Sequence, residues 1–354
     1  MDVDVVIAGL GVSGSSLAYA LSEKGYKINA YDPIKKYEKA CGEQVSASYN
    51  SINLLKKSNS IVTMPNDISI YVNNKEVSNI NFGGNTPWYI INKPNFIQYL
   101  RDSALSNGVN IIYKPWNNER GMITVDARGP FSGNLKDKIL VKRYIVETEW
   151  DPNHVILDFR PNELGLYWIF PADDQGKLVN LGGGFVNLWD DEKLTKLIIE
   201  YARYNLKKVE VKNTKAAPLD VFSPYKPYSP SDNIFYVGEA AGLVLSISGE
   251  GNRPAIESSY ALADAIRKHN LEDIYEIKND YIRYSKKVAN ESFLSRKLFM
   301  FITKYKENFD MVNILSNIPK WFWYKYLSVS LEFNDVIKLG SDIKFILSII
   351  KGIK

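Results

Sequence analysis

The first 32 residues combine apolar runs and glycine turns in a pattern that predicts a strand, a helix and a second strand. A short buried strand is expected over residues 3–7, and apolar positions recur at helical spacing over residues 17–21. Gly25 follows the predicted helix, and the segment YKINAY fits the next strand. This order of elements is typical of the first unit of a parallel sheet.

A related pattern begins at Asn233, far along the chain. The segment NIFYVGE predicts a strand that ends at Gly238 and Glu239, and a Gly-rich loop follows it. After Gly251, apolar and small residues recur at helical spacing as far as Ile266. Both regions therefore have a glycine turn between a strand and the N-terminus of a helix.

The rest of the chain divides into β-patterned and helical parts. Runs such as ISIYV and HVILDFR lie within residues 56–90 and 136–222, and they predict a sheet outside the two glycine units. Beyond residue 265 the pattern is helical and aromatic, and it includes the segment KWFWYKY at residues 320–326. The chain is thus expected to have three parts that interleave in the sequence.

Composition narrows the class of protein. The 354 residues are 45% hydrophobic and 24% charged, so they can bury a large core. A single cysteine excludes a disulfide within the chain, and two histidines leave little for a metal site, so we expect no metal and a reducing compartment. The first residues show no basic leader, and no run approaches the roughly 20 apolar residues of a membrane span. We therefore expect a cytoplasmic protein.

Charge is distributed unevenly along the chain. The net charge is +4, and Lys and Arg outnumber Asp and Glu by 14 to 8 over residues 275–354. This basic part has no block of like charges and no nucleic-acid motif, so a solvated helical face is favoured over nucleic-acid binding. The segment at residues 320–326 would suit a helix on an anionic membrane surface, and packing of the helices on the part of the chain that contains the two glycine regions is the alternative.

The N-terminal glycines form a candidate phosphate-binding turn. Gly9 permits a tight turn, Gly11 lets backbone N–H groups approach a pyrophosphate, and Gly14 lets the helix pack closely on the strand. The helix N-terminus adds about half a positive charge. Asp32, at the end of the second strand, can accept hydrogen bonds from a ribose. We interpret the pattern as a dinucleotide site, with a Gly-rich turn of an unrelated α/β unit as the alternative.

The region after Asn233 favours a flavin over a nicotinamide. Glu239 at a strand end can accept hydroxyls of a ribityl chain, and the helix that starts near Asn252 points its N–H groups toward the Gly249 and Gly251 loop. The two glycine regions resemble the first and last FAD signatures of glutathione-reductase-type flavoproteins, which include aromatic hydroxylases, flavin-dependent halogenases and geranylgeranyl reductases. The last signature usually reads Gly-Asp, and the pair Gly238-Glu239 keeps the acceptor on a longer side chain. The resemblance implies FAD as cofactor.

Two further segments resemble one branch of this superfamily. ACGEQVS, which contains Cys41, Gly42 and Glu43, is similar to the Cys-Gly-Glu segment of archaeal and plant geranylgeranyl reductases. LYWIFPADDQGKLVNLGGGF is similar to their Tyr-x-Trp-x-Phe-Pro segment and the strand after it. The halogenase motif Trp-x-Trp-x-Ile-Pro is matched less well, because Leu166 and Phe170 replace its first Trp and its Ile. The matches cover about residues 3–266.

The resemblance implies a discontinuous domain organisation. We expect an α/β fold in which a Rossmann-like FAD-binding domain is interleaved with an antiparallel-sheet substrate domain and followed by a helical C-terminal region. The predicted segments are 1–55, 91–135 and 223–270 for the FAD domain, 56–90 and 136–222 for the substrate domain, and 271–354 for the helical region.

The resemblance also gives the single cysteine a chemical role. Hydride addition to an isolated double bond needs a proton on the other carbon, and a positioned acid accelerates such a step roughly 100- to 10,000-fold. Cys41 is the candidate acid, and Glu43 is the candidate to polarise it or relay protons. The alternative is that Cys41 is a small buried hydrophobic residue.

The aromatic segment supplies candidates for substrate binding. Tyr167 and Ile169 point to one face of the predicted strand, whereas Trp168 and Phe170 point to the other. We expect side chains among Tyr167, Trp168 and Phe170 to line an apolar substrate channel. The alternative is that all three pack in the core.

These features together favour an FAD-dependent reductase that saturates C=C bonds of geranylgeranyl-type isoprenoid chains. A flavin-dependent monooxygenase acting on a hydrophobic small molecule is the main alternative, and an electron carrier or lipid-binding module is a third. No second Gly-x-Gly-x-x-Gly is present, so electrons are expected from NAD(P)H that visits transiently or from a small redox carrier. The expected partners are an isoprenoid or lipid substrate and, peripherally, a membrane.

Overall fold

The computed structural model describes residues 3–133 and 138–352. A six-stranded sheet holds the N-terminal unit, in the order β15-β16-β9-β1-β2-β8. Its strands are parallel except for β15, which runs antiparallel to β16. The strand bounds are β1 Val5–Ala8, β2 Ile28–Tyr31, β8 Asn110–Ile112, β9 Ile123–Asp126, β15 Tyr228–Ser229 and β16 Ile234–Tyr236. Both glycine regions of the sequence thus belong to one parallel sheet.

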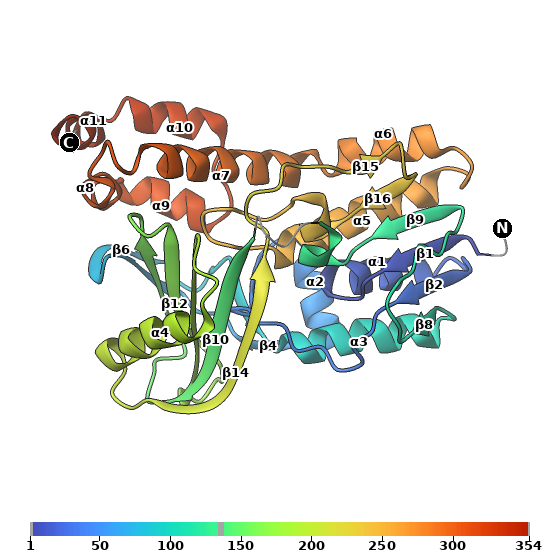
Figure 1. Ribbon diagram of the computed structural model, residues 1–354, viewed down its shortest axis with the longest axis horizontal. Helices are drawn as coiled ribbons and strands as arrows, with labels where there is room; N and C mark the ends of the chain where they lie inside the picture. Colours follow the sequence, from blue (N-terminus) through green and yellow to red (C-terminus); the bar gives the residue numbers. More distant parts are fainter. Residues whose placement is uncertain (1–2, 134–137, 353–354) are drawn as a thin grey trace.

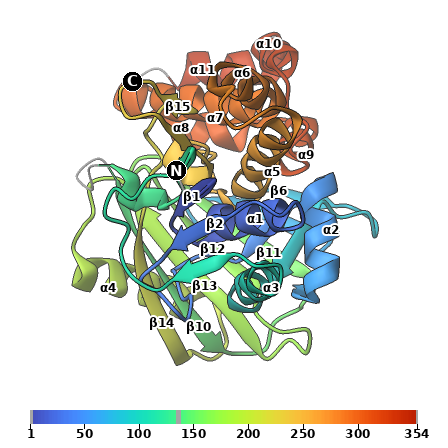
Figure 2. The same cartoon turned by 90° about the vertical axis from the view of Figure 1, so that its right-hand side faces the viewer.

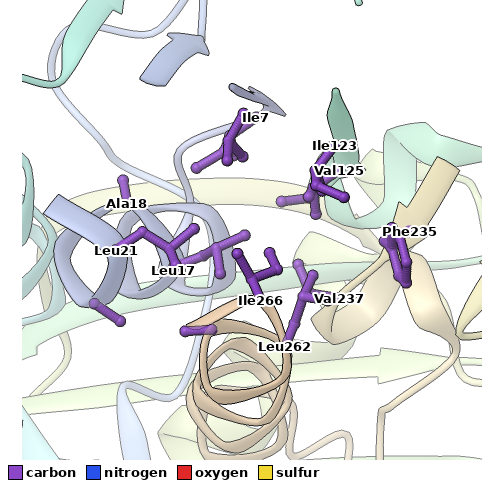
Figure 3. Close-up of a cluster of buried hydrophobic side chains, with 14 of the residues drawn as sticks. Ile7, Leu17, Ala18, Leu21, Ile123, Val125, Phe235, Val237, Leu262 and Ile266 are labelled. Atoms are coloured by element: carbon purple, nitrogen blue, oxygen red, sulfur yellow. The ribbon is translucent and has the colours of Figure 1, made fainter. Parts of the chain in front are cut away.

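Three long helices accompany this sheet: α1 Val12–Ser22, α3 Lys93–Ser106 and α5 Asn252–Lys268. Leu17 and Leu21 of α1 meet Leu262 and Ile266 of α5 in one core that also contains side chains of β1, β9 and β16 (Figure 3). This burial brings the first and last parts of the Rossmann-like unit together, although more than 200 residues separate them in the sequence.

A seven-stranded sheet lies beside the first, in the order β14-β10-β13-β12-β11-β5-β6 (Figure 1). All neighbours are antiparallel except β11 and β5, which are parallel. The bounds are β5 Asp67–Val72, β6 Lys75–Asn81, β10 Ile139–Glu147, β11 His154–Arg160, β12 Gly165–Pro171, β13 Leu178–Phe185 and β14 Glu210–Leu219. Helix α4, Asp191–Asn205, packs on one face of this sheet. The predicted α/β fold with an interleaved second sheet is confirmed. The prediction that this second sheet is antiparallel is wrong for one pair of strands, β11 and β5, which are parallel.

A third, small sheet joins the two larger ones. It contains β3 Gln44–Ser46, β7 Trp88–Ile91 and β4 Ile61–Thr63 in the order β3-β7-β4, and α2 Tyr49–Ser58 connects β3 to β4. The sequence pattern does not predict this small sheet. Strands of three or four residues are too short to show an alternating pattern, and this pairing joins segments that were assigned to different domains.

The C-terminal helices gather along one side of the molecule (Figure 1 and Figure 2). They are α6 Ile274–Tyr284, α7 Lys286–Tyr305, α8 Met311–Ser316, α9 Lys320–Leu327, α10 Phe333–Gly340 and α11 Ile343–Lys351. None of the helices in the described part of the chain is long and apolar enough to cross a membrane.

Helix α9 holds the aromatic segment, and part of that segment packs against the seven-stranded sheet. Trp323 stacks on Phe159 with ring centroids 5.7 Å apart, and the indole Nε1 of Trp88 donates to the Leu327 carbonyl at 2.9 Å. Phe322 is also buried. The expected membrane contact of this segment stays a prediction. The alternative, packing of the C-terminal helices on the Rossmann-like unit, holds for α6, because Ile277 and Tyr281 lie in the core of that unit, whereas α9 packs on the second sheet.

Candidate functional site

A cavity of about 870 Å³ lies between the six-stranded sheet and the seven-stranded sheet. Its walls include the Gly9 turn and the Gly249 loop, which the sequence separates by more than 200 residues. Twelve of the predicted site residues line it: Gly9, Gly11, Asp32, Cys41, Gly42, Glu43, Trp168, Phe170, Glu239, Gly249, Gly251 and Asn252. The fold therefore brings the candidate cofactor, catalytic and substrate residues to one space.

The Gly9 turn is shaped by steric limits that only glycine meets. Gly9 has φ +90°, and a Cβ there would lie 2.7 Å from the Ala127 carbonyl oxygen. A Cβ on Gly14 would lie 1.8 Å from the Gly9 carbonyl oxygen, so Gly14 allows α1 to approach the turn although it does not line the cavity. Gly11, the N-cap of α1, supplies no side-chain cap, so the first N–H groups of the helix remain available to a ligand.

Asp32 lies at the end of β2 and is held in place by three donors. Its carboxylate accepts hydrogen bonds from the Leu10 amide at 2.6 Å, the Ile34 amide at 2.8 Å and Arg101 Nη2 at 3.2 Å. A carboxylate has about four acceptor positions, so one remains for a ligand hydroxyl in the cavity. Arg101 is buried in α3 and also donates to the Leu10 carbonyl, which fixes the turn before α1.

Sequence reasoning missed Arg101. A buried arginine on a helix gives no signal in a hydrophobic pattern, because its partners, the Leu10 carbonyl and the Asp32 carboxylate, come from other elements. No local spacing rule would have found it.

The second glycine region presents another helix N-terminus to the same cavity. Gly251 is the N-cap of α5 and supplies no side-chain cap, and Gly249 has φ +70°. Gly238 does not line the cavity. Its φ is +61°, and a Cβ there would lie 2.9 Å from Ser13 of α1, so it is a packing position between the two units.

Glu239 has protein partners on both of its carboxylate oxygens. Oε1 accepts from the Asp220 amide at 2.8 Å, and Oε2 accepts from Lys39 Nζ at 2.9 Å. Lys39 comes from the loop after β2, which also forms an ion pair from Glu38 to Lys215 of β14 at 2.6 Å. The longer acid in place of the usual Asp therefore reaches a cation across the cavity wall.

The segment Cys41–Glu43 crosses the cavity beside the seven-stranded sheet. Glu43 has φ +59°, a left-handed conformation that is uncommon outside glycine and is found preferentially at functional sites. A Cβ on Gly42 would lie 2.7 Å from Phe170 Cε2, so the backbone runs directly over that ring. The Ile91 amide of β7 donates to the Glu43 carbonyl at 2.9 Å, which links the segment to the small sheet.

Donors surround the Cys41 sulfur. Sγ accepts from the Glu43 amide at 3.2 Å and from Asn252 Nδ2 at 3.5 Å. Asn252 also donates to the Gln44 carbonyl at 2.8 Å, so the first residue of α5 is fixed on this segment. N–H donors stabilise the negative charge that forms when a thiol releases its proton.

Two buried cations, Lys93 and Arg143, lie near Cys41 and Glu43. Lys93, at the start of α3, is 5% exposed; burial lowers its pKa, but its interactions with Cys41, Tyr37 and Glu43 outweigh burial and raise the pKa overall. Burial raises the pKa of Glu43, although Arg143 and Lys93 oppose that effect. Arg143 Nη2 of β10 lies 3.8 Å from Glu43 Oε1. The site thus combines a thiol, a carboxyl group and two cations in a buried environment.

The two faces of β12 have separate environments. Trp168 and Phe170 line the cavity, and Trp168 Nε1 donates to Asn180 Oδ1 at 3.0 Å. Asn180 Nδ2 in turn donates to the Cys41 carbonyl at 2.9 Å, so an aromatic wall residue and the catalytic candidate share one polar link.

The prediction that Tyr167 binds substrate does not fit the structure. Its ring stacks on Tyr201 of α4 at 4.2 Å, on the far face of the sheet from the cavity. The two-residue period of a strand explains this result, because a neighbour of a cavity residue must point away.

Two of the three glycines of β13 make room for these aromatic rings. A Cβ on Gly182 would lie 2.2 Å from Trp168 Cζ2, and one on Gly183 would lie 2.8 Å from Tyr167 Cδ1. The segment LGGGF is therefore a surface that accommodates aromatic side chains.

Comparisons with known proteins give one sequence relative and many structural ones. No family model matches the chain. A protein of uncharacterized function from Methanocaldococcus jannaschii is 26% identical over 330 residues, which cover 79% of this chain and 87% of that protein.

Among solved structures, a geranylgeranyl bacteriochlorophyll reductase-like protein from Thermoplasma acidophilum has a TM-score of 0.77 at 17% identity and covers 99% of this chain and 98% of its own. PqsL of Pseudomonas aeruginosa, described as a probable FAD-dependent monooxygenase, has a TM-score of 0.57 at 15% identity and covers 85% of this chain and 99% of its own. At these identities the likeness shows the fold alone. The chain therefore shares its fold with the reductase-like protein over nearly its whole length and with the probable FAD-dependent monooxygenase over 85% of its length.

Proposed function

We propose that the protein is an FAD-dependent oxidoreductase and that the large cavity holds the cofactor. The observation that carries this proposal is the convergence of two helix N-termini without side-chain caps, at Gly11 and Gly251, on one cavity that also contains Asp32. N–H groups at helix N-termini suit a pyrophosphate and a reduced flavin ring, and the remaining acceptor position of Asp32 suits a ribose hydroxyl. Similarity of fold to a probable FAD-dependent monooxygenase supports the same cofactor.

Within this class we propose reduction of C=C bonds in an isoprenoid chain. When bound and reduced, FAD would supply a hydride to one carbon of the double bond. Cys41 would donate the proton to the other carbon, and the donors on its sulfur would stabilise the thiolate that remains. In the cell, electrons would come from NAD(P)H or from a small redox carrier.

The apolar part of the cavity supports a hydrophobic substrate. Trp168 and Phe170 continue into a wall formed by side chains of the seven-stranded sheet and of the C-terminal helices, namely Val141, Leu157, Leu166, Phe299 and Leu327. Few polar groups interrupt this wall, so affinity would come from burial of hydrocarbon at roughly 25 cal/mol per Å².

The experiment that tests this reaction is a mass measurement. Geranylgeraniol would be incubated without oxygen with dithionite-reduced, FAD-loaded protein. We expect the product to gain the mass of two hydrogen atoms for each bond that is saturated. Unchanged substrate, with FAD still bound, would count against the isoprenoid reaction and leave the cofactor proposal standing.

A flavin-dependent monooxygenase is the second candidate, and the likeness to PqsL favours it. A monooxygenase consumes oxygen and adds an oxygen atom to its substrate. Oxygen uptake coupled to a hydroxylated product would support it, whereas anaerobic gain of hydrogen would support the reductase.

We also propose that the C-terminal end of the protein rests on an anionic lipid surface. Five large apolar side chains of α10 and α11 are exposed: Phe333 by 71%, Ile337 by 58%, Ile343 by 73%, Leu347 by 47% and Ile350 by 57%. The exposed charged residues within these two helices are all lysines, whereas Asp335 is buried and paired with Lys325 at 2.6 Å. Exposed apolar groups beside lysines suit insertion at an anionic headgroup layer.

Vesicle sedimentation tests this surface. We expect the protein to sediment with phosphatidylglycerol-containing vesicles, to do so less in high salt, and to lose binding in a Phe333→Ser, Ile343→Ser variant. Protein that stays in the supernatant with every vesicle would contradict the proposal.

A further inference from the structure

A second, smaller cavity lies on the other side of Glu43. Its volume is about 280 Å³, and within the described part of the chain Glu43 is the one residue that lines both this cavity and the large one. Its polar wall residues are Asn92, Arg143, Asn180 and Asn213, together with Glu43 itself. Arg143 and Asn180 are buried, whereas Asn92 and Asn213 are exposed, so the cavity extends from the protein surface to the Glu43 carboxyl group.

We propose that this second cavity is the path by which solvent protons reach Glu43, and that Arg143 positions Glu43 to pass them to Cys41. The proposal rests on the proposed function, because it explains how the acid of that reaction is restored between turnovers. It adds a route, a positioning residue and a direction of proton movement.

Arg143 has the environment expected of a residue held for this purpose. It is 6% exposed, and its Nε has no hydrogen-bond acceptor among the described residues. Among the described residues its one ion-pair partner is Glu43, at 3.8 Å, which is longer than a direct hydrogen bond. A buried guanidinium with so few protein partners lowers the stability of the fold unless water or a carboxylate is close. Arg143 and Glu43 both line the second cavity, which also gives water access to Arg143.

Charges face Glu43 from two elements besides its own segment. Arg143 approaches from β10 on the side of the second cavity, and Lys93 approaches from α3, while Cys41 lies two residues away on the same segment. Burial favours the neutral carboxyl group and the two cations favour the carboxylate. Burial is the larger effect, so the pKa of Glu43 is raised overall, which favours the protonated carboxyl group that can give up a proton.

The proton balance is simple. Cys41 gives its proton to the substrate and becomes a thiolate. The protonated Glu43 carboxyl group then gives its proton to that thiolate and becomes a carboxylate. A proton from solvent, arriving through the second cavity, restores the carboxyl group, so each reduced double bond consumes one solvent proton by this route.

The first test needs no substrate, since Cys41 is the only cysteine. The rate of alkylation by iodoacetamide would be measured against pH by the mass of the intact protein. In the unchanged protein we expect the plot of alkylation rate against pH to show an inflection where Glu43 titrates. The reason is that the charge of Glu43 changes the fraction of Cys41 that is present as thiolate. Glu43→Gln should remove that inflection. Arg143→Met should move it upward by about one pH unit, since loss of a nearby cation favours the neutral carboxyl group.

Two variants guard against misfolding as an explanation. Arg143→Lys keeps the charge and should leave the inflection near its original pH. Lys142→Met is a matched control on the same strand, because Lys142 is also buried but pairs with Asp191 on the opposite face. Identical pH profiles in the unchanged protein, Glu43→Gln and Arg143→Met would overturn the proposal.

The second test uses the reaction with geranylgeraniol. Glu43→Gln should complete the first turnover within about threefold of the normal rate and then slow at least about tenfold in later turnovers, since the thiolate is not reprotonated. Equal slowing of the first and later turnovers would contradict a relay. If no form of the protein reduces the alcohol, the proposed function fails, while the alkylation profile still decides whether Arg143 and Glu43 are coupled to Cys41.

Discussion

The Gly9 turn and the Cys41–Glu43 segment line the same cavity but are built in different ways. The turn is local: Gly9, Gly14 and Asp32 meet because a strand, a helix and a strand follow one another. The Cys41–Glu43 segment takes its environment from four distant elements, β10, α3, β13 and α5, which contribute Arg143, Lys93, Asn180 and Asn252. The Gly9 turn thus binds the ligand through local structure, whereas the reactivity of the Cys41–Glu43 segment depends on side chains from distant elements.

The largest expected effect is at the turn. Gly14→Val puts side-chain atoms where the Gly9 carbonyl already lies, 1.8 Å from the position of a Cβ. We expect loss of copurified FAD and a decrease in the free energy of unfolding of more than about 3 kcal/mol. Thermal unfolding and release of cofactor measure both.

Gly340→Ala is the control for that substitution. Apart from the backbone of its own helix, a Cβ at Gly340 would meet no atom of the described residues within 4 Å, and the φ of Gly340 is not positive. It should change neither quantity. If Gly340→Ala had an effect as large as that of Gly14→Val, the close approach of α1 to the Gly9 turn would not explain the loss of FAD and stability.

The next effect is at the reacting segment. Cys41→Ala should leave FAD bound and slow alkene reduction at least about tenfold, because a positioned acid is lost. The rate is measured from product mass under anaerobic conditions. Cys41→Ser keeps a weaker acid, so its rate of alkene reduction should lie between the rates of the unchanged protein and of Cys41→Ala. A normal rate in Cys41→Ala would return this residue to a packing role.

A smaller effect compares the two faces of β12. Trp168→Phe removes the donor to Asn180 and should raise the substrate KM by about three- to tenfold, since about 1 kcal/mol of positioning is lost. Tyr167→Phe changes a ring that stacks on Tyr201 away from the cavity, so its KM should match that of the unchanged protein. Steady-state kinetics distinguish them, and equal KM changes would refute the assignment of faces.

The smallest effect is on stability. Burial raises the pKa of Glu43 above its ordinary 4.5, so the folded protein disfavours the carboxylate. A raised carboxyl pKa contributes stability at low pH, and that contribution is lost as pH rises from about 4.5 through the folded pKa. Glu43→Gln should therefore raise Tm relative to the unchanged protein at pH 7 more than at pH 4. The reverse order would show that the cations outweigh burial.

How far the sequence predicts the site follows from the same comparison. The Rossmann-like unit could be predicted, because strand and helix periods and glycine spacing are local features. The small sheet β3-β7-β4, Arg101 and Arg143 could not, since short strands lack a pattern and buried cations are recognised only by partners from other elements.

The aromatic segments show the same limit. The strand period separates Trp168 from Tyr167 but does not say which of them faces the cavity. The aromatic residues of α9 suggested a membrane contact, yet Trp323 stacks on Phe159 within the protein. In both cases tertiary packing, rather than local pattern, decides which ring is free.

The most direct test of the account is the cofactor content of purified protein. The protein would be expressed, reconstituted with FAD if needed, and heated to release what it holds, and the released molecule would be identified by mass. We predict one FAD per chain, with binding abolished by Gly14→Val and retained by Cys41→Ala. A colourless protein that cannot be reconstituted with FAD would contradict the claim that the two glycine regions grip a single flavin cofactor.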